Sequence, residues 1–249
     1  MTTPLLPGAE PFSHAGGARG VLVLHGFTGS PASMRPLAEV LAAAGYSVEL
    51  PLLPGHGTSV EDMKATGWAD WTAAALAAYD DLAARSQSVA VVGLSMGGGL
   101  TAHVAQHRAV AACVFINPLV KPVDPELYRG LEELLAAGVE EFESIGEDIK
   151  KEGVSEAAYP ATPLVCAKSL FDGVAELHEG LSSISAPGLL LQSREDHVVT
   201  ADNGDALFER VAGPLERIWL EDSYHVATLD NDRPLVEAAT LSFLERTLA

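Results

Sequence analysis

The chain has 249 residues, of which 48% are hydrophobic and 20% are charged, and this composition excludes a disordered, collagen-like or coiled-coil protein. Lys and Arg total 15 against 34 Asp and Glu, which gives a formal net charge of −19. Such an acidic chain repels the phosphates of nucleic acids and anionic lipid headgroups, so we expect no nucleic-acid partner.

The sequence also bears on the compartment of the protein. Its first residues lack the basic and long apolar segments of a signal peptide, and no apolar run approaches the ~18 residues of a membrane span. Cys113 and Cys166 fall in apolar runs and are expected to be buried thiols rather than a disulfide framework. We therefore expect a cytoplasmic protein without an integral membrane segment.

Short apolar runs alternate with longer helical patterns along the chain. The predicted strands cover residues 21–24, 47–52, 88–92, 111–116, 188–192 and 217–220. The predicted helices cover residues 33–44, 66–85, 95–107, 201–211 and 234–248. Nearly continuous apolar strands separated by helices predict the α/β class, with a mostly parallel sheet that is covered on both faces.

One segment interrupts this alternation. Residues 119–183 contain no convincing strand, and the leucines of residues 127–135 recur at helical spacing. We interpret 119–183 as a small helical cap inserted above the strand ends of an α/β core formed by 1–118 and 184–249. An ordinary pair of helices in the outer layer is the alternative interpretation.

The first chemical motif is Gly93-Leu-Ser-Met-Gly97, which matches the G-x-S-x-G pattern of a nucleophile elbow. In such a turn the serine has a strained backbone, and its hydroxyl projects from the end of the sheet because the flanking glycines permit close packing. A predicted strand directly precedes the motif and a predicted helix directly follows it. Ser95 is therefore the candidate nucleophile.

A serine hydroxyl needs a general base, and His225 is the candidate among eight histidines. It follows the last predicted strand, at the sheet edge where Ser95 is also expected. Asp196 follows the strand before that one and is the candidate for the carboxylate that orients the imidazole. The chain order Ser95, Asp196, His225 is typical of this architecture, although Glu195 and Asp222 compete with Asp196.

The oxyanion of an acyl-transfer reaction needs two backbone donors. We expect one to be the N–H of Met96, directly after the nucleophile, and the other to be the N–H of Phe27, in the loop after the first central strand. His25 is expected to brace that loop through hydrogen bonds rather than to transfer protons.

Five ordered motifs carry a family resemblance: His25-Gly-Phe-Thr-Gly-Ser-Pro31, Pro54-Gly-His-Gly-Thr58, Gly93-Leu-Ser-Met-Gly-Gly98, Gln192-Ser-Arg-Glu-Asp-His-Val-Val199 and Ser223-Tyr-His-Val-Ala-Thr-Leu-Asp230. Together they resemble the α/β-hydrolase superfamily and, more narrowly, bacterial monoacylglycerol lipases and their carboxylesterase relatives. Ile145-Gly-Glu-Asp-Ile-Lys150 and Glu152-Gly-Val154 extend the resemblance into the predicted cap.

The resemblance implies hydrolysis of the ester between a fatty acyl chain and glycerol, through an acyl-enzyme and without a cofactor. It implies that the cap residue Glu156 contacts the glycerol hydroxyls and that Ile145 lines the cap wall. Leu119, Leu170 and Phe171 are candidates for the apolar lining of an acyl tunnel, as is Leu164. A transient contact of the cap with a lipid surface is also expected.

Several other functions are possible for a chain with these motifs. A broader carboxylesterase would use the same triad, and an aminopeptidase with an acidic cap would use it on peptides. A non-catalytic ligand-binding protein of the same fold is a further alternative, since fold alone does not define function. The sequence has neither an H-E-x-x-H motif nor paired cysteines, so we expect no metal site.

Overall fold

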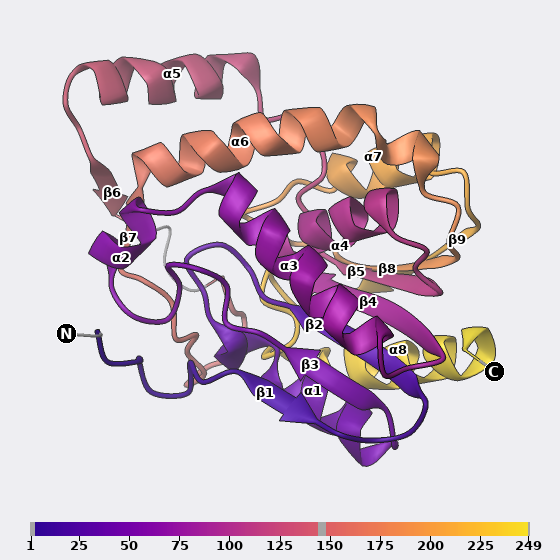
Figure 1. Ribbon diagram of the computed structural model, residues 1–249. Coiled ribbons are helices and arrows are strands. Elements are labelled where there is room, and N and C mark those ends of the chain that lie inside the picture. Colours follow the sequence, from indigo (N-terminus) through magenta and orange to yellow (C-terminus); the bar gives the residue numbers. More distant parts are fainter. Residues whose placement is uncertain (1–2, 144–147, 249) are drawn as a thin grey trace.

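The computed structural model describes residues 3–143 and 148–248. Within these residues the main sheet has seven strands in the order β1-β3-β2-β4-β5-β8-β9, and every neighbouring pair is parallel except β1 with β3 (Figure 1). This arrangement confirms the predicted α/β class and mostly parallel sheet. The strands are β1 (Phe12–His14), β2 (Arg19–Leu24), β3 (Ser47–Leu50), β4 (Ser88–Leu94), β5 (Ala112–Ile116), β8 (Gly188–Ser193) and β9 (Leu215–Leu220).

Helices cover both faces of the main sheet. They are α1 (Arg35–Ala43), α2 (Val60–Lys64), α3 (Trp68–Ala83), α4 (Met96–His107), α5 (Pro125–Ala136), α6 (Leu164–Glu179), α7 (Asp202–Arg210) and α8 (Arg233–Thr247), with short 3₁₀ turns at Pro31–Ser33 and Leu181–Ser183. The strand β1 and the helix α2 were not predicted, because three and five residues are too few for a clear hydrophobic period.

Alternate side chains of the central strands point to two separate apolar clusters. Leu22 and Leu24 of β2 belong to the cluster under α3, α4, α6 and α7, whereas Val21 and Val23 belong to the cluster under α1 and α8. All four side chains are fully buried. Strands that are covered on both faces need apolar residues at every position, which explains why their sequence showed no polar alternation.

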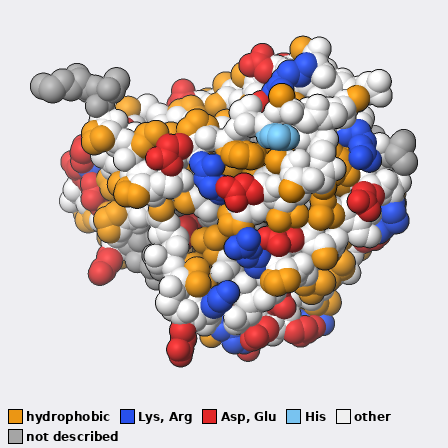
Figure 2. Space-filling model, turned by 90° about the horizontal axis from the view of Figure 1, so that it is seen from below, with side chains coloured by type: hydrophobic (Ala, Val, Ile, Leu, Met, Phe, Trp, Pro, Cys, Tyr) orange, Lys and Arg blue, Asp and Glu red, His pale blue; other side chains and the backbone are white. Residues whose placement is uncertain are grey.

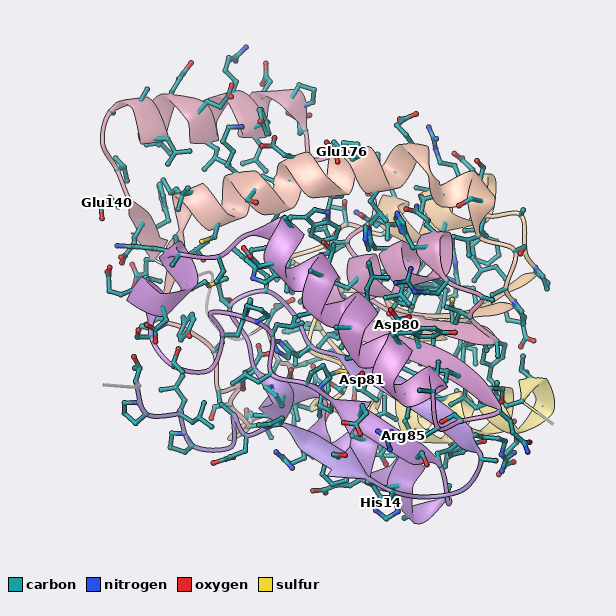
Figure 3. All side chains as sticks on the ribbon, in the orientation of Figure 1. His14, Asp80, Asp81, Arg85, Glu140 and Glu176 are labelled. Carbon is teal, nitrogen blue, oxygen red and sulfur yellow. The ribbon has the colours of Figure 1, made fainter. Side chains whose placement is uncertain are left out.

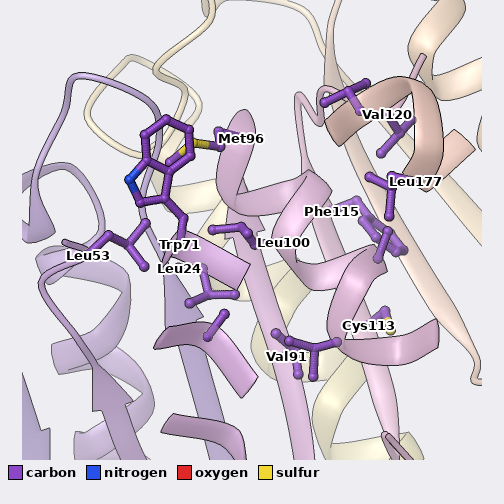
Figure 4. Packing of buried hydrophobic residues seen from close by; sticks show 14 of the residues in the cluster. Leu24, Leu53, Trp71, Val91, Met96, Leu100, Cys113, Phe115, Val120 and Leu177 are labelled. Carbon is purple, nitrogen blue, oxygen red and sulfur yellow. The ribbon is translucent and has the colours of Figure 1, made fainter. Parts of the chain in front are cut away.

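The first cluster lies directly beneath the candidate site. Figure 4 shows Trp71 of α3 beside Met96 at the start of α4, with Leu24 and Leu100 below them. Charged side chains lie outside this core: Asp80 and Asp81 are on the exposed side of α3, and Glu176 is on that of α6 (Figure 3). On the face drawn in Figure 2, acidic side chains are interspersed with basic and apolar ones.

The 119–183 segment contains α5, α6 and an antiparallel pair of short strands, β6 (Glu141–Glu143) and β7 (Ala161–Pro163). The expectation of no strand in this segment was therefore wrong, since strands of three residues leave almost no pattern in a sequence. In Figure 1, α6 crosses over α3 and α4, and α5 lies outside α6. Leu170, Val174 and Leu177 of α6 belong to the main core, so this segment shares the hydrophobic core of the sheet.

The parallel strands bring several loops to one edge of the sheet, because their carboxyl ends all point the same way. The non-glycine residues with positive φ in the described ranges are Thr28, Ser95 and Asn117, at 59°, 58° and 41°. Each follows a strand of the main sheet, namely β2, β4 and β5. Such strained conformations cluster at functional sites, so this edge of the sheet is the candidate location of the active site.

Candidate active site

Ser95 lies in the turn that its motif predicts. The strand β4 ends at Leu94, Ser95 has φ 58° and ψ −120°, and α4 begins at Met96. A Cβ on Gly93 would lie 2.0 Å from the carbonyl oxygen of Gly97, and a Cβ on Gly97 would lie 2.2 Å from that of Leu24. Because no side chain fits at either position, the two glycines allow the tight strand-to-helix turn that presents the serine at the sheet edge.

His225 and Asp196 form a buried pair. The imidazole Nδ1 lies 2.8 Å from Asp196 Oδ2, and their side chains are 8% and 5% exposed. A carboxylate only accepts hydrogen bonds, so Nδ1 donates and Nε2 is left as the basic nitrogen. The other oxygen of Asp196 accepts the backbone N–H groups of Val198 and Val199 at 2.9 and 2.8 Å, which fixes the carboxylate.

The two competing carboxylates point to a different partner. Lys150 Nζ lies 3.1 Å from Asp222 Oδ1 and 3.2 Å from Glu195 Oε2. Both carboxylates are more than half exposed, unlike that of Asp196. The pairing with His225 therefore favours Asp196, as expected from chain order, and assigns Asp222 and Glu195 to a surface ion-pair cluster.

The expected oxyanion donors lie on two segments that meet at Ser95. Met96 is the first residue of α4, where backbone N–H groups have no partner within the helix and the helix dipole favours negative charge. Phe27 is in the loop after β2, which comes close to the nucleophile, because a Cβ on Gly26 would lie 3.5 Å from Ser95 Cβ. The two segments that carry the N–H groups of Met96 and Phe27 therefore both lie close to Ser95, where the oxyanion is expected.

Two buried histidines support the loop that carries Phe27. His25 Nδ1 donates to the carbonyl of Gly26, and its Nε2 accepts the N–H of Leu53 at 3.1 Å. His56 Nδ1 donates to the carbonyl of Pro54, and its ring contacts His25 edge-on at 5.1 Å. Burial lowers the pKa of His25 to about 3 and that of His56 to about 4. Both rings are therefore neutral at pH 7, in keeping with a bracing role for His25.

A cavity of about 300 Å³ opens over Ser95 and His225. Its lining is mostly apolar, and it includes the expected acyl-chain residues Leu119, Leu170 and Phe171. Leu164 is not among the lining residues; it packs with Leu131 and Ala167 in a small cluster between α5 and α6. Ile145, the other expected cap residue, lies outside the described residues. The full lining is Phe27, Thr28, Ser95, Leu119, Val123, Leu127, Asp148, Glu156, Ala158, Thr162, Ala167, Leu170, Phe171, Val198, Val199, His225 and Val226.

Glu156 supplies a carboxylate to this cavity. A Cβ on Gly29 would lie 2.8 Å from Glu156 Oε1, which places the carboxylate against the loop that carries Phe27. The neighbouring backbone is fixed there, since the N–H of Tyr159 donates to the carbonyl of Thr28 at 3.0 Å. Glu156 and Asp148 are thus the acidic residues of a pocket whose lining is otherwise largely apolar.

Sequence reasoning missed a buried amide that holds the loop of His225. Asn117 Nδ2 donates to the carbonyl of His225 at 2.8 Å and to Ser193 Oγ at 2.9 Å. Asn117 Oδ1 accepts the N–H of Ser193 at 2.8 Å. The available signal was a polar residue directly after the apolar strand β5. Sequence reasoning also missed Asp148, whose contacts are described below.

No group of three or more His, Cys, Asp or Glu side chains in residues 3–143 and 148–248 could hold a metal ion. In the same ranges no helix combines the length and the apolar character that crossing a bilayer requires.

The sheet order, the elbow and the His–Asp pair define an α/β-hydrolase. The chain belongs to the family described as serine aminopeptidase, S33, whose model matches residues 18–232. It is 43% identical over 246 residues to a thermostable monoacylglycerol lipase from Bacillus sp. (strain H-257), covering 98% of this chain and 97% of that one. It is 30% identical over 243 residues to a carboxylesterase from Bacillus subtilis (strain 168), covering 95% and 96%.

Solved structures of lipolytic enzymes have the same fold as this chain. A structure reported with the metagenome-derived lipolytic enzymes LipS and LipT has a TM-score of 0.93 and 43% identity, and the alignment covers 98% of this chain and 100% of that one. The monoacylglycerol lipase of Paleococcus ferrophilus has a TM-score of 0.79 at 18% identity over 94% and 98% of the two chains. At that identity the second likeness concerns the fold alone.

Proposed function

We propose that this chain is a serine ester hydrolase that cleaves monoacylglycerols to a fatty acid and glycerol. The observation that carries the proposal is the 2.8 Å pair of His225 and Asp196, which shares one mostly apolar cavity with the elbow residue Ser95. The 43% identity to a monoacylglycerol lipase across nearly the whole chain supports the substrate class.

In the proposed mechanism Ser95 Oγ attacks the acyl carbonyl while His225 Nε2 takes the hydroxyl proton. Asp196 stabilises the imidazolium that forms, and the N–H groups of Phe27 and Met96 bind the negatively charged carbonyl oxygen. The tetrahedral intermediate then expels the glycerol oxygen, which takes the proton from His225. Water, deprotonated by His225, then attacks the carbonyl of the acyl-enzyme, and the bond to Ser95 Oγ breaks as Ser95 takes the proton from His225 and the fatty acid leaves.

In the proposed division of the chain, the core formed by residues 1–118 and 184–249 carries the catalytic residues. Both this core and the cap, residues 119–183, line the substrate cavity. The apolar side chains Leu119, Leu170 and Phe171 are proposed to contact the acyl chain. The carboxylate of Glu156 is proposed to accept hydrogen bonds from the glycerol hydroxyls, a role for which a charged acceptor is well suited.

A transient contact with lipid is proposed at the cavity mouth. Leu127 of α5 is 59% exposed and Val198 is 41% exposed, and both line the cavity over Ser95. They also line an adjoining cavity of about 390 Å³. Exposed apolar side chains at the mouth of a pocket favour contact with an apolar substrate or surface. The cytoplasmic location stays a prediction.

A general carboxylesterase is the second candidate, and the 30% identical carboxylesterase favours it. The deciding experiment compares rates on glycerol monolaurate, glycerol dilaurate, methyl laurate and a short peptide with a free N-terminus. We expect the highest kcat/KM on the monolaurate. A preference for methyl laurate would instead support the carboxylesterase, and release of the N-terminal residue of the peptide would support an aminopeptidase.

A further inference from the structure

The carboxylate of Asp148 lies between the 119–183 segment and both loops of the His–Asp pair. Its Oδ2 accepts the backbone N–H of His225 at 3.0 Å and that of His197 at 3.1 Å. Its Oδ1 lies 2.8 Å from the ring Nδ1 of His197, which donates to it. The backbone carbonyl of Asp148 accepts the N–H of Val226 at 3.1 Å. One residue therefore contacts both loops through four hydrogen bonds.

These contacts bear directly on the catalytic geometry. His197 follows Asp196 in the chain, so Asp148 binds the loop of the acid on one side and the loop of the base on the other. The Asp148 side chain is only 10% exposed, and hydrogen bonds to a charged carboxylate are stronger than those between neutral groups. The carboxylate thus fixes the distance between two loops whose side chains must meet at 2.8 Å.

The residues that follow Asp148 are held in the same way. Asp230, which is 1% exposed, accepts the N–H groups of Lys150 and Lys151 at 2.7 and 2.9 Å and that of Tyr224 at 2.8 Å. The Lys150 ammonium joins Glu195 to Asp222, one from each loop. Hydrogen bonds and ion pairs of charged side chains therefore hold residues 148–151 against the loops of both Asp196 and His225.

We propose that Asp148 is a positioning residue for the triad, a proposal that rests on the proposed roles of Ser95, Asp196 and His225. The 119–183 segment then does more than form a wall of the substrate cavity. It contributes an anion that holds the imidazole of His225 in line with the Asp196 carboxylate. Because misplacing a reacting group by about 1 Å can lower a rate ~10²-fold, loss of this anion should lower kcat by about that factor.

The test compares Asp148→Asn with Asp172→Asn. Asp172 is a matched control in the same segment, because its carboxylate bonds Lys168 and Tyr128 and touches neither loop of the pair. We expect Asp148→Asn to lower kcat on glycerol monolaurate about 10²-fold with little change in KM. Asp172→Asn should keep the wild-type kcat. The proton NMR resonance of the His225 Nδ1–H, hydrogen bonded to Asp196, should shift or broaden only in Asp148→Asn.

A second variant covers the case in which Asp148→Asn does not fold. His197→Ala removes a half-exposed ring and only one of the bonds to Asp148, so it should fold and lower kcat several-fold. A wild-type kcat and an unchanged resonance in folded Asp148→Asn, or a wild-type kcat in His197→Ala, would overturn the role of Asp148. Ser95→Ala in the same assay separates the two proposals, since its full activity would overturn the proposed function itself.

Discussion

The sheet and the 119–183 segment contribute to the site in different ways. Each chemical group of the proposed triad follows a strand of the sheet directly or by a few residues, so the direction of the strands decides where it lies. The 119–183 segment contributes no strand to the main sheet among the described residues, and it reaches the site through side chains. Glu156 lines the cavity, and Asp148 bonds the loops of Asp196 and His225. The sheet therefore supplies the proposed triad, and the 119–183 segment supplies substrate contacts and the carboxylate of Asp148.

The two regions are nevertheless one packed unit. The helix α6 shares the main core with α3 and α4, whereas α5 contacts α6 through a small cluster around Leu131, Leu164 and Ala167. Stability should therefore fall off from the sheet through α6 to α5, because buried apolar contacts decrease in that order. Substitutions in the sheet loops, and of Asp148, should affect every substrate alike, while substitutions of the cavity-lining residues of the 119–183 segment, such as Glu156, should change the preference among substrates.

The largest effect is expected at the nucleophile and the base. Ser95→Ala and His225→Ala should each lower kcat by about 10⁶-fold on monoacylglycerol and on simple esters, because neither group can act without the other. Hydrolysis rates measure the loss of kcat, and thermal melting shows whether each variant is folded. Near-normal turnover by either folded variant would contradict the assignment.

A smaller loss is expected at the acid. Asp196→Asn should lower kcat by about 10⁴-fold, because an amide favours the wrong tautomer of His225. Asp222→Asn is the matched control, since Asp222 pairs with Lys150 at the surface, and it should keep most of the activity. Initial rates on glycerol monolaurate distinguish the two, and a greater loss in Asp222→Asn would move the role of acid to that residue.

A selective effect is expected in the 119–183 segment. Glu156→Gln should lower kcat/KM for glycerol monolaurate about 10- to 100-fold, which corresponds to the loss of one hydrogen bond to a charged group. Methyl laurate has no glycerol hydroxyls and should be much less affected. Parallel assays on the two esters measure the difference. An equal loss on both would show that Glu156 supports the fold or the triad rather than glycerol recognition.

The last prediction concerns stability rather than rate. Burial lowers the pKa of His25 to about 3 and that of His56 to about 4, from 6.5 for an exposed imidazole. Both residues bind fewer protons in the folded state, so their contribution to stability is complete above pH 6.5 and is lost as the pH falls towards 4 for His56 and towards 3 for His25. At pH 5 the loss is about 2 kcal/mol for each ring.

Chemical denaturation between pH 7 and pH 4.5 measures this loss. His56→Gln, which keeps a side-chain donor for the carbonyl of Pro54, serves as the comparison. It should have a shallower dependence of unfolding free energy on pH than the wild type. An identical dependence in the two proteins would show that His56 does not contribute to acid sensitivity.

The sequence by itself determined the parts of the protein that depend on local order. Apolar runs such as 88–92 and 111–116 identify buried strands, because a strand covered on both faces leaves no polar position. The glycines around Ser95 identify the elbow, since only a residue without a Cβ fits against Leu24 and Gly97. Their positions after the last two predicted strands, together with the chain order, then indicated Asp196 and His225 as the other members of the proposed triad.

Tertiary structure decided what depends on residues far apart in the chain. The choice between Asp196 and Asp222 rests on the 2.8 Å contact of Asp196 with His225 and on Lys150, which pairs with Asp222 and Glu195 from another segment. The contacts of Asp148 join residues 49 and 77 positions away, and the strands β6 and β7 exist because they pair with each other. Such contacts follow from the packed fold, in which distance along the sequence no longer limits which charges and hydrogen-bonding groups meet.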